Sequence, residues 1–217
     1  HYLHIFILVL ISFFSTTSLF AYDFEVNGIY YNVLSEEERT CEVTKGYNEY
    51  FGEVVIPSSI SYVDKVFSVK SIGYAAFQDC NGLTSVTISN NVNRIGEYAF
   101  ANTGLISIVI PNSVTDIGRA SFENCQNLTS LTIGNSVNYI REFAFQYCYG
   151  LTSVIISNSV TSIEQHAFAH TGLTSIYIPN SVTNIGEYAF KGCHFFESVA
   201  IDNSNPPSIS IGDGIFN

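Results

Sequence analysis

The 217-residue chain contains no methionine and no tryptophan, and only 12% of its residues are charged. Globular proteins usually have about twice that charged fraction. Apolar residues make up 47% of the sequence. A disordered, strongly solvated chain combines low hydrophobicity with high charge, so this composition excludes that class. A domain has about 150 residues on average, and the length therefore predicts one domain with at most a small extension.

Basic residues are also scarce. The chain has 8 lysines and arginines against 19 aspartates and glutamates, which gives a formal net charge of −11. Such a chain offers no basic surface to neutralise phosphates, so we expect no nucleic-acid partner. The same acidity disfavours binding to anionic glycans or membranes.

An apolar run near the start predicts export. Residues 5–14 (IFILVLISFF) are almost unbroken in their apolar character, and a short polar stretch and the small residue Ala21 follow. Ten residues are too few to cross a bilayer, which takes about 20. We interpret residues 1–21 as a signal peptide rather than a buried strand or helix, and expect a secreted or cell-surface protein. Because the first residue is His1 and not methionine, we expect the sequence to lack its true start.

Most of the remaining chain is a repeat of 22 or 23 residues. An isoleucine marks each of six units: Ile72, Ile95, Ile117, Ile140, Ile163 and Ile185. A phenylalanine follows five residues later in every unit: Phe77, Phe100, Phe122, Phe145, Phe168 and Phe190. Internal repeats of this length are typical of solenoids, in which a unit buries its apolar face only against its neighbours.

Each unit contains one clear strand signal. In the stretch L-T-S-V-x-I, alternate residues such as Val86 and Ile88 face inward, while Ser85 and Thr87 face outward. Stacked copies would pair these strands in parallel, about 4.8 Å apart. Turn-forming pairs such as Pro111-Asn112 follow the strands. The segment that returns on the other side could be a turn or a short helical piece.

This pattern resembles the leucine-rich repeats, and in particular their BspA-like subclass. The resemblance rests on residues 112–118 (NSVTDIG) and 128–133 (LTSLTI) with their equivalents, and it covers about residues 66–201. It implies a curved solenoid with a parallel strand face, secreted or displayed on the surface of bacteria and of some parasitic protists. It also implies adhesion to host proteins or other cells, and it brings no catalytic residues.

The flanking segments lack the regular period. We expect residues 22–65 to form a β-rich N-terminal cap with an atypical first repeat, because Asn27-Gly28 predicts a hairpin and residues 40–44 and 54–56 predict strands. We expect residues 66–201 to hold the six repeats. Residues 202–217 contain the first half of a seventh repeat. An uncapped end would expose core to water, so we expect truncation there rather than a ragged end.

Cysteine and histidine are the residues that could carry chemistry. Four of the five cysteines share one repeat position, Cys80, Cys125, Cys148 and Cys193, and threonine takes that position in the two shorter units. We expect a ladder of small buried side chains rather than disulfides or metal ligands. Cys41, in the cap, has no obvious partner.

Histidines do not form a recognisable metal motif. His166 and His170 are spaced as in the zinc motif H-E-x-x-H, but Ala167 replaces the glutamate, and His194 lies one unit later. Phosphate-binding loops and serine-nucleophile motifs are also missing from the sequence. We therefore expect no enzyme activity, no metal and no cofactor. A histidine-based enzyme is kept as an alternative that metal analysis would test.

A row of outward strand residues is the candidate binding surface. Its members are Thr87, Val109, Thr132, Ile155, Tyr177 and Ala200, beside a parallel row of serines. Leucine-rich repeats generally bind partners on this face, so we assign ligand contacts to Val109, Thr132, Ile155 and Tyr177. Alternatively, these residues are there only because they favour strands.

The function predicted from the sequence is a non-enzymatic protein-binding module. We expect it to mediate adhesion to a protein ligand, such as host extracellular matrix or another cell surface. The alternative is a structural spacer that displays another domain beyond residue 217.

Overall fold

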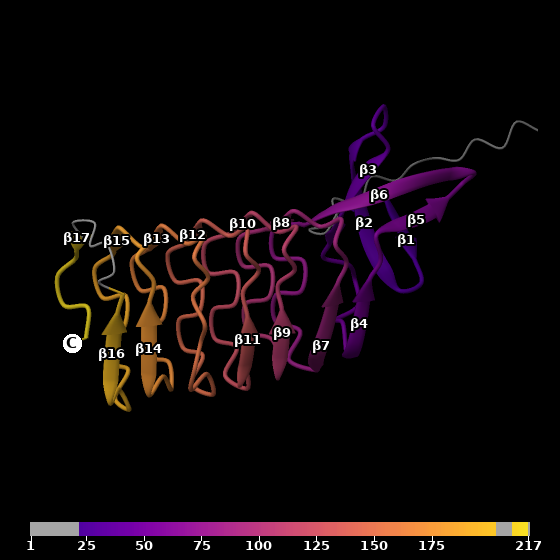
Figure 1. Cartoon of the computed structure of the whole chain (residues 1–217). Helices are drawn as coiled ribbons and strands as arrows, with labels where there is room; N and C mark the ends of the chain where they lie inside the picture. The colour runs from indigo at the N-terminus through magenta and orange to yellow at the C-terminus, as the bar shows by residue number, and fades with distance from the viewer. Residues whose placement is uncertain (1–21, 203–209, 217) are drawn as a thin grey trace, which may run out of the picture.

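The computed structural model describes residues 22–202 and 210–216. The predicted signal peptide, residues 1–21, lies outside this range, as does the middle of the predicted seventh repeat. The described residues form strands and turns and contain no helix, so none of them forms a helix that could span a membrane. The strands form a row of stacked rungs, with the N-terminal strands at one end (Figure 1).

One face of the stack is a parallel ladder, which we call the long ladder. Its strands are β4 (Gly52–Ile56), β7 (Leu83–Ile88), β9 (Ser107–Val109), β11 (Ser130–Thr132), β14 (Ser175–Ile178) and β16 (Ser198–Ile201). Strands β4, β7, β9 and β11 form one paired group, each strand lying beside the next, and β14 and β16 form a second. Ile155 joins the two groups through single bridges to Thr132 and Tyr177. The alternating β-branched residues of the repeat thus form the predicted strand face (Figure 1).

The returning segments form a second parallel ladder of very short strands, the short ladder. It consists of β6 (Lys65–Ile72), β8 (Arg94–Ile95), β10 (Asp116–Ile117), β12 (Tyr139–Ile140), β13 (Ser162–Ile163), β15 (Asn184–Ile185) and β17 (Ser210–Ile211). The repeated isoleucines pair directly in two runs, from β6 to β10 and from β12 to β17, for example Ile95 with Ile117 and Ile163 with Ile185, and among the described residues no strand pairing joins β10 to β12. The conformation that the sequence left open is therefore a two-residue strand followed by a turn.

The turns around each core phenylalanine are held by hydrogen bonds between rungs. The N–H of Phe77 donates to the carbonyl of Ala99, 2.8 Å away, and the N–H of Phe100 donates to Ser121 at 2.7 Å. Residues two before and two after the phenylalanine have left-handed backbones, as Tyr98 (φ 54°) and Asn102 (φ 58°) do. A left-handed residue costs about 1 kcal/mol and interrupts a right-handed helix. The backbone hydrogen bonds to the neighbouring rung offset that cost. The left-handed residues therefore persist, and the segment does not form a helix.

The core is a continuous column of apolar side chains inside the rungs. The repeated phenylalanines are fully buried and stack with centroid separations of 5.0 Å (Phe77 and Phe100) to 5.7 Å (Phe168 and Phe190). Near-parallel offset rings at this spacing are favourable beyond the area they bury. In the seventh unit, Phe216 continues the column at 5.8 Å from Phe190.

Residues 22–65 form a β-rich segment at the N-terminal end, whose strands are continuous with both ladders. Strands β1 (Phe24–Val26) and β2 (Ile29–Ser35) make an antiparallel hairpin, and Asn27 and Gly28 both have positive φ in its turn, as predicted. Strand β3 (Thr40–Thr44) has the predicted bounds and pairs in parallel with β6, which attaches this segment to the short ladder. Strand β5 (Ser59–Tyr62) pairs with the outer part of β6.

The last strand of the long ladder departs from the prediction. Val199 and Ile201 were expected to face inward, but they are 40% and 37% exposed, whereas their equivalents Ile176 and Ile178 are buried. The difference arises because β16 pairs only with β14 within the described part of the chain. An inward side chain of this fold needs a rung on each side to be buried.

Candidate protein-binding face

The four predicted contact residues lie in one row on the long ladder. Val109 pairs with Thr132, Thr132 with Ile155, and Ile155 with Tyr177. All four are exposed, Val109 by 63%, Ile155 by 82% and Tyr177 by 51%. The structure therefore brings together residues that are 68 positions apart in the sequence.

The row is longer than the sequence indicated. Thr87 and Ala200 belong to it as the sequence predicted, and Val55 of β4 adds one more residue, because it pairs with Thr87 and is 64% exposed. Val55 was not predicted as a contact residue, although its strand was predicted as an atypical first rung. Its place in the row depends on the register of β4 against β7, which shifts between Gly52 and Glu53.

The face is hollowed over its first rungs. A depression of about 610 Å³ lies over β7, β9 and β11, with Val109 and Thr132 in its lining. Asn90, Asn112 and Asn135, from the turns after the strands, supply amide groups along one side. Ile155 and Tyr177 lie beyond this depression, so the face combines a hollow of mixed polar and apolar lining with two exposed apolar side chains.

Tyr177 is held in place by a neighbouring carboxylate. Its side chain hydrogen-bonds that of Asp202, and this contact raises the pKa of the phenol. The bond orients an exposed aromatic ring at the C-terminal part of the row. A tyrosine of this kind offers a contact area with few rotatable bonds, and such residues are enriched in protein interfaces.

Charged side chains gather on the short ladder instead. Asp116 pairs with Arg94 at 3.3 Å and with Arg141 at 2.9 Å, and Arg119 pairs with Glu142 at 3.4 Å. The chain has only four arginines, and three of them belong to these pairs. The strand face, by contrast, carries Val, Thr, Ile, Tyr and Ala along its row.

The histidines take part in ring stacking. His166 lies between Phe143 and Tyr188, with centroid separations of 5.1 and 5.2 Å, and His170 stacks on Tyr147 at 5.0 Å. Partial burial, followed by the charge of Lys191, lowers the pKa of His166. No group of three or more possible metal ligands exists among the described residues.

The cysteines form the predicted buried ladder. All five are free and buried. Each thiol of the inner units donates to the phenylalanine carbonyl one rung back, as Cys125 does to Phe100 at 3.1 Å and Cys148 does to Phe122 at 3.2 Å. Thr103 takes the same position in its unit, and its hydroxyl contacts the Cys125 sulfur at 3.1 Å.

Stacked rungs of 22 or 23 residues, each with one strand on a common parallel face, define the leucine-rich-repeat class of solenoid. Within that class the chain belongs to the family of the BspA type leucine rich repeat region, whose model matches residues 70–197 in six copies. Proteins of this family are typically found on the bacterial surface or secreted, and leucine-rich-repeat proteins generally bind other proteins. No curated protein matches the chain.

Solved structures show the same fold. A leucine rich cell surface protein from Faecalibacterium prausnitzii A2-165 is 29% identical, with a TM-score of 0.63 over 82% of this chain and 54% of that one. The chain thus spans about half the length of this neighbour. The leucine rich repeat protein of T. pallidum is 21% identical, with a TM-score of 0.53 over 87% of this chain and 85% of that one.

Proposed function

We propose that this chain is a non-enzymatic adhesion module, exported by residues 1–21, that binds a protein ligand through the outward row of the long ladder. The contact residues are Val109, Thr132, Ile155 and Tyr177. The ligand is a protein of the host extracellular matrix or of another cell surface. The observation that carries this proposal is the continuous exposed row, in which Ile155 is 82% exposed.

The apolar side chains on this face remain exposed to water in the fold, so a partner that covers them gains the free energy of burying their surface. Burial of apolar surface contributes about 25 cal/mol per Å². Val109, Ile155 and Tyr177 stand beside a row of serines on the parallel ladder, so a partner can bury them and also bond the hydroxyls. This mixture of an apolar centre and polar surroundings is typical of protein interfaces.

The test is binding of the purified protein to immobilised matrix proteins and bacterial surface preparations. The variant carries Ile155→Asp and Tyr177→Asp, which place two charges on the face. The matched control carries Val63→Asp and Tyr149→Asp, which add the same charge at residues that are exposed elsewhere. We expect saturable binding that the first variant loses by at least tenfold and the control keeps.

Two results would contradict the proposal. Binding that survives in the Ile155 and Tyr177 variant would place the contact outside this row. Absence of binding to every preparation would instead favour a structural spacer that displays another domain.

A further inference from the structure

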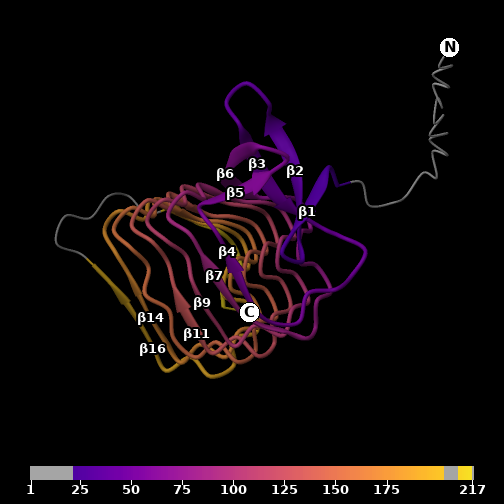
Figure 2. The same cartoon turned by 90° about the vertical axis from the view of Figure 1, so that its right-hand side faces the viewer.

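The long ladder begins with a strand whose outer edge is open. Strand β4 is the terminal strand in the order β11-β9-β7-β4. Within the described ranges its residues have no backbone partner on the side away from β7. The short ladder differs, because β3 pairs with β6 and covers that end. Figure 2, which looks at the N-terminal end of the stack, shows β4 as the first strand of its ladder.

A groove runs along this open edge. It has a volume of about 470 Å³, within the usual range for ligand sites. One wall consists of β4 and the residues before it, including Phe51 and Val55, and the other is the turn of the β1–β2 hairpin, residues 26–29. Tyr31, Tyr50 and Ile60 are buried and also line it. The groove therefore has room for a segment lying beside β4.

Strand β4 has neither lysine nor proline, two of the usual protections of an open edge against strand pairing. Open edges in natural proteins are commonly blunted by lysine, by proline within the strand or by a covering segment. Here β4 reads GEVVI, and the exposed side chains Phe51 and Val55 are 66% and 64% accessible. The charged residues of the groove lining are Glu49 and Glu53, with no lysine, arginine or histidine among the lining residues that the structure describes.

We propose that this groove binds an extended peptide segment of a partner protein, with alternating apolar and basic residues, by strand addition to β4. Backbone hydrogen bonds to the open edge supply affinity. Side chains alternate along an added strand, so its apolar residues would lie on the inner side with Val54 and Ile60, and its basic residues on the outer side with Glu49 and Glu53. The groove lining includes none of the proposed contact residues Val109, Thr132, Ile155 and Tyr177, so its test does not depend on the proposed adhesion contacts.

The probe is an eight-residue capped peptide of alternating valine and lysine, titrated into the full chain by calorimetry at physiological salt. A peptide with glutamate in place of lysine should bind at least tenfold more weakly. A valine–lysine peptide with its central amides N-methylated cannot donate to β4, and it should also bind at least tenfold more weakly. These comparisons use the unaltered protein, so they do not depend on whether a variant folds.

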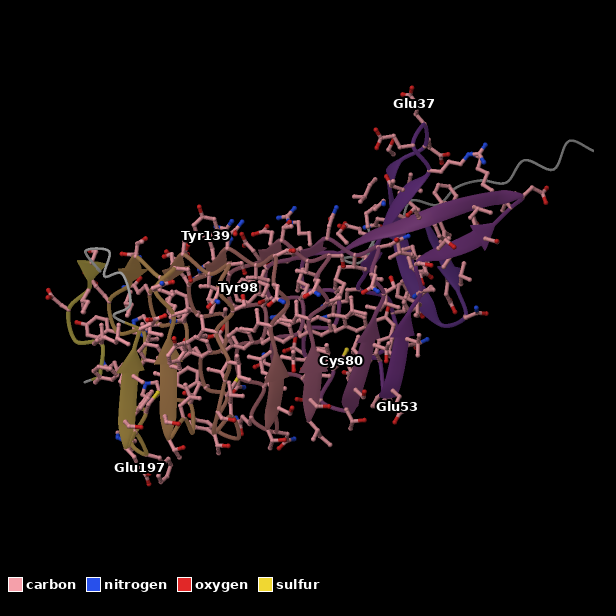
Figure 3. The ribbon with its side chains drawn as sticks, in the orientation of Figure 1. Glu37, Glu53, Cys80, Tyr98, Tyr139 and Glu197 are labelled. Carbon is pink, nitrogen blue, oxygen red and sulfur yellow. The ribbon has the colours of Figure 1, made fainter. Side chains whose placement is uncertain are left out.

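A charge-reversal pair locates the site. Glu49→Lys with Glu53→Lys should reduce binding at least tenfold, while Glu37→Lys with Glu38→Lys should leave it unchanged. Both pairs change the net charge equally, and Figure 3 shows Glu53 and Glu37 on opposite sides of the N-terminal end. The Ile155→Asp, Tyr177→Asp variant should bind the peptide like the unaltered protein.

Three results would overturn the proposal. Equal binding of the N-methylated peptide would show that the attraction is electrostatic only. Equal loss in both charge-reversal pairs would show that net charge, not the groove, is responsible. No detectable binding of the valine–lysine peptide would show that the edge does not accept an added strand.

Discussion

The guanidinium of Arg119 lies over the ring of Phe143, with its Cζ 4.8 Å from the ring centroid. The same group is 5.7 Å from the centroid of Tyr98. It thereby bridges a gap in an outer column of rings, because Ala120 stands at the position that Tyr98, Phe143, His166 and Tyr188 occupy in four other units. Glu142 pairs with Arg119 at 3.4 Å and fixes the guanidinium there.

Arg119→Ala should lower the free energy of unfolding by about 1 kcal/mol, because a cation over two rings contributes about 0.5–2 kcal/mol. Arg119→Lys should recover only part of the loss, since an ammonium group does not stack flat on a ring. Urea denaturation gives the values. Arg39→Ala, in an exposed turn, is the control, and equal effects of Arg119→Ala and Arg39→Ala would show that the stacked arginine adds nothing.

Phe145→Ala should cost about 3–5 kcal/mol of stability, as other buried phenylalanines do. Its ring is fully buried and stacks on Phe122 at 5.2 Å and on Phe168 at 5.3 Å, so truncation leaves a cavity in the middle of the column. Thermal and urea unfolding measure the loss. Tyr149→Ala is the control: this side chain is exposed and lies outside the core, so its loss should change stability little. A melting temperature unchanged in Phe145→Ala would mean that the column is not the core.

The repeat was enough to predict the stack and its core. A residue is buried in this fold by the same residue one unit away, so a period of 22 or 23 residues predicts both the contact and its partner. Ile95, Phe100 and Leu105 and their equivalents in the inner units are buried as predicted. Alternation in the strands likewise placed Ile155 and Tyr177 outward.

Other features depend on contacts that local sequence does not encode. Tyr98 and His166 have left-handed backbones although bulky side chains disfavour them, because their N–H groups bond to the next rung, Tyr98 to Arg119 at 3.1 Å and His166 to Glu187 at 3.1 Å. Val55 joins the row only through an irregular register. These arrangements follow from residues 20 or more positions away, beyond any turn signal.

The buried cysteines should not react with thiol reagents in the folded protein. All five thiols are buried away from a reagent, and burial raises the pKa of Cys41 to about 11 and also that of Cys80 and Cys193, so their reactive thiolate is scarce near pH 8. Native protein should give almost no colour with a disulfide reagent at pH 8, and protein in guanidinium should give five thiols per chain. Stoichiometric reaction of the native protein would contradict this.

Cys148→Thr should be tolerated, because Thr103 and Thr171 occupy the same position and donate to a phenylalanine carbonyl at 2.9 Å in their own units. We expect a loss of no more than about 1 kcal/mol. Cys148→Leu is the comparison, since overpacking this position should cost about 1–3 kcal/mol. If threonine destabilises as much as leucine does, the thiol has a role that a hydroxyl cannot take.

Glu42 should make the stability depend on pH. Burial raises the pKa of this carboxyl group above its ordinary value, although Ser71 donates to Oε2 at 3.2 Å and Arg94 lies nearby. The folded protein therefore holds the Glu42 proton more tightly than the unfolded chain does. The resulting contribution to stability is fully present below the unfolded pKa of about 4.3 and is lost as pH rises through the raised folded pKa.

Glu42→Gln keeps an oxygen that can accept from Ser71 and removes the buried charge. We expect the variant to be more stable than the unaltered protein at pH 7, with a difference that shrinks towards zero as both are brought below the unfolded pKa. Urea denaturation across that range measures it, with Glu37→Gln at an exposed position as the control. A difference that stays constant with pH would mean that the charge of Glu42 is not penalised in the fold. A variant that is less stable at pH 7 would mean that Arg94 stabilises the carboxylate by more than burial destabilises it.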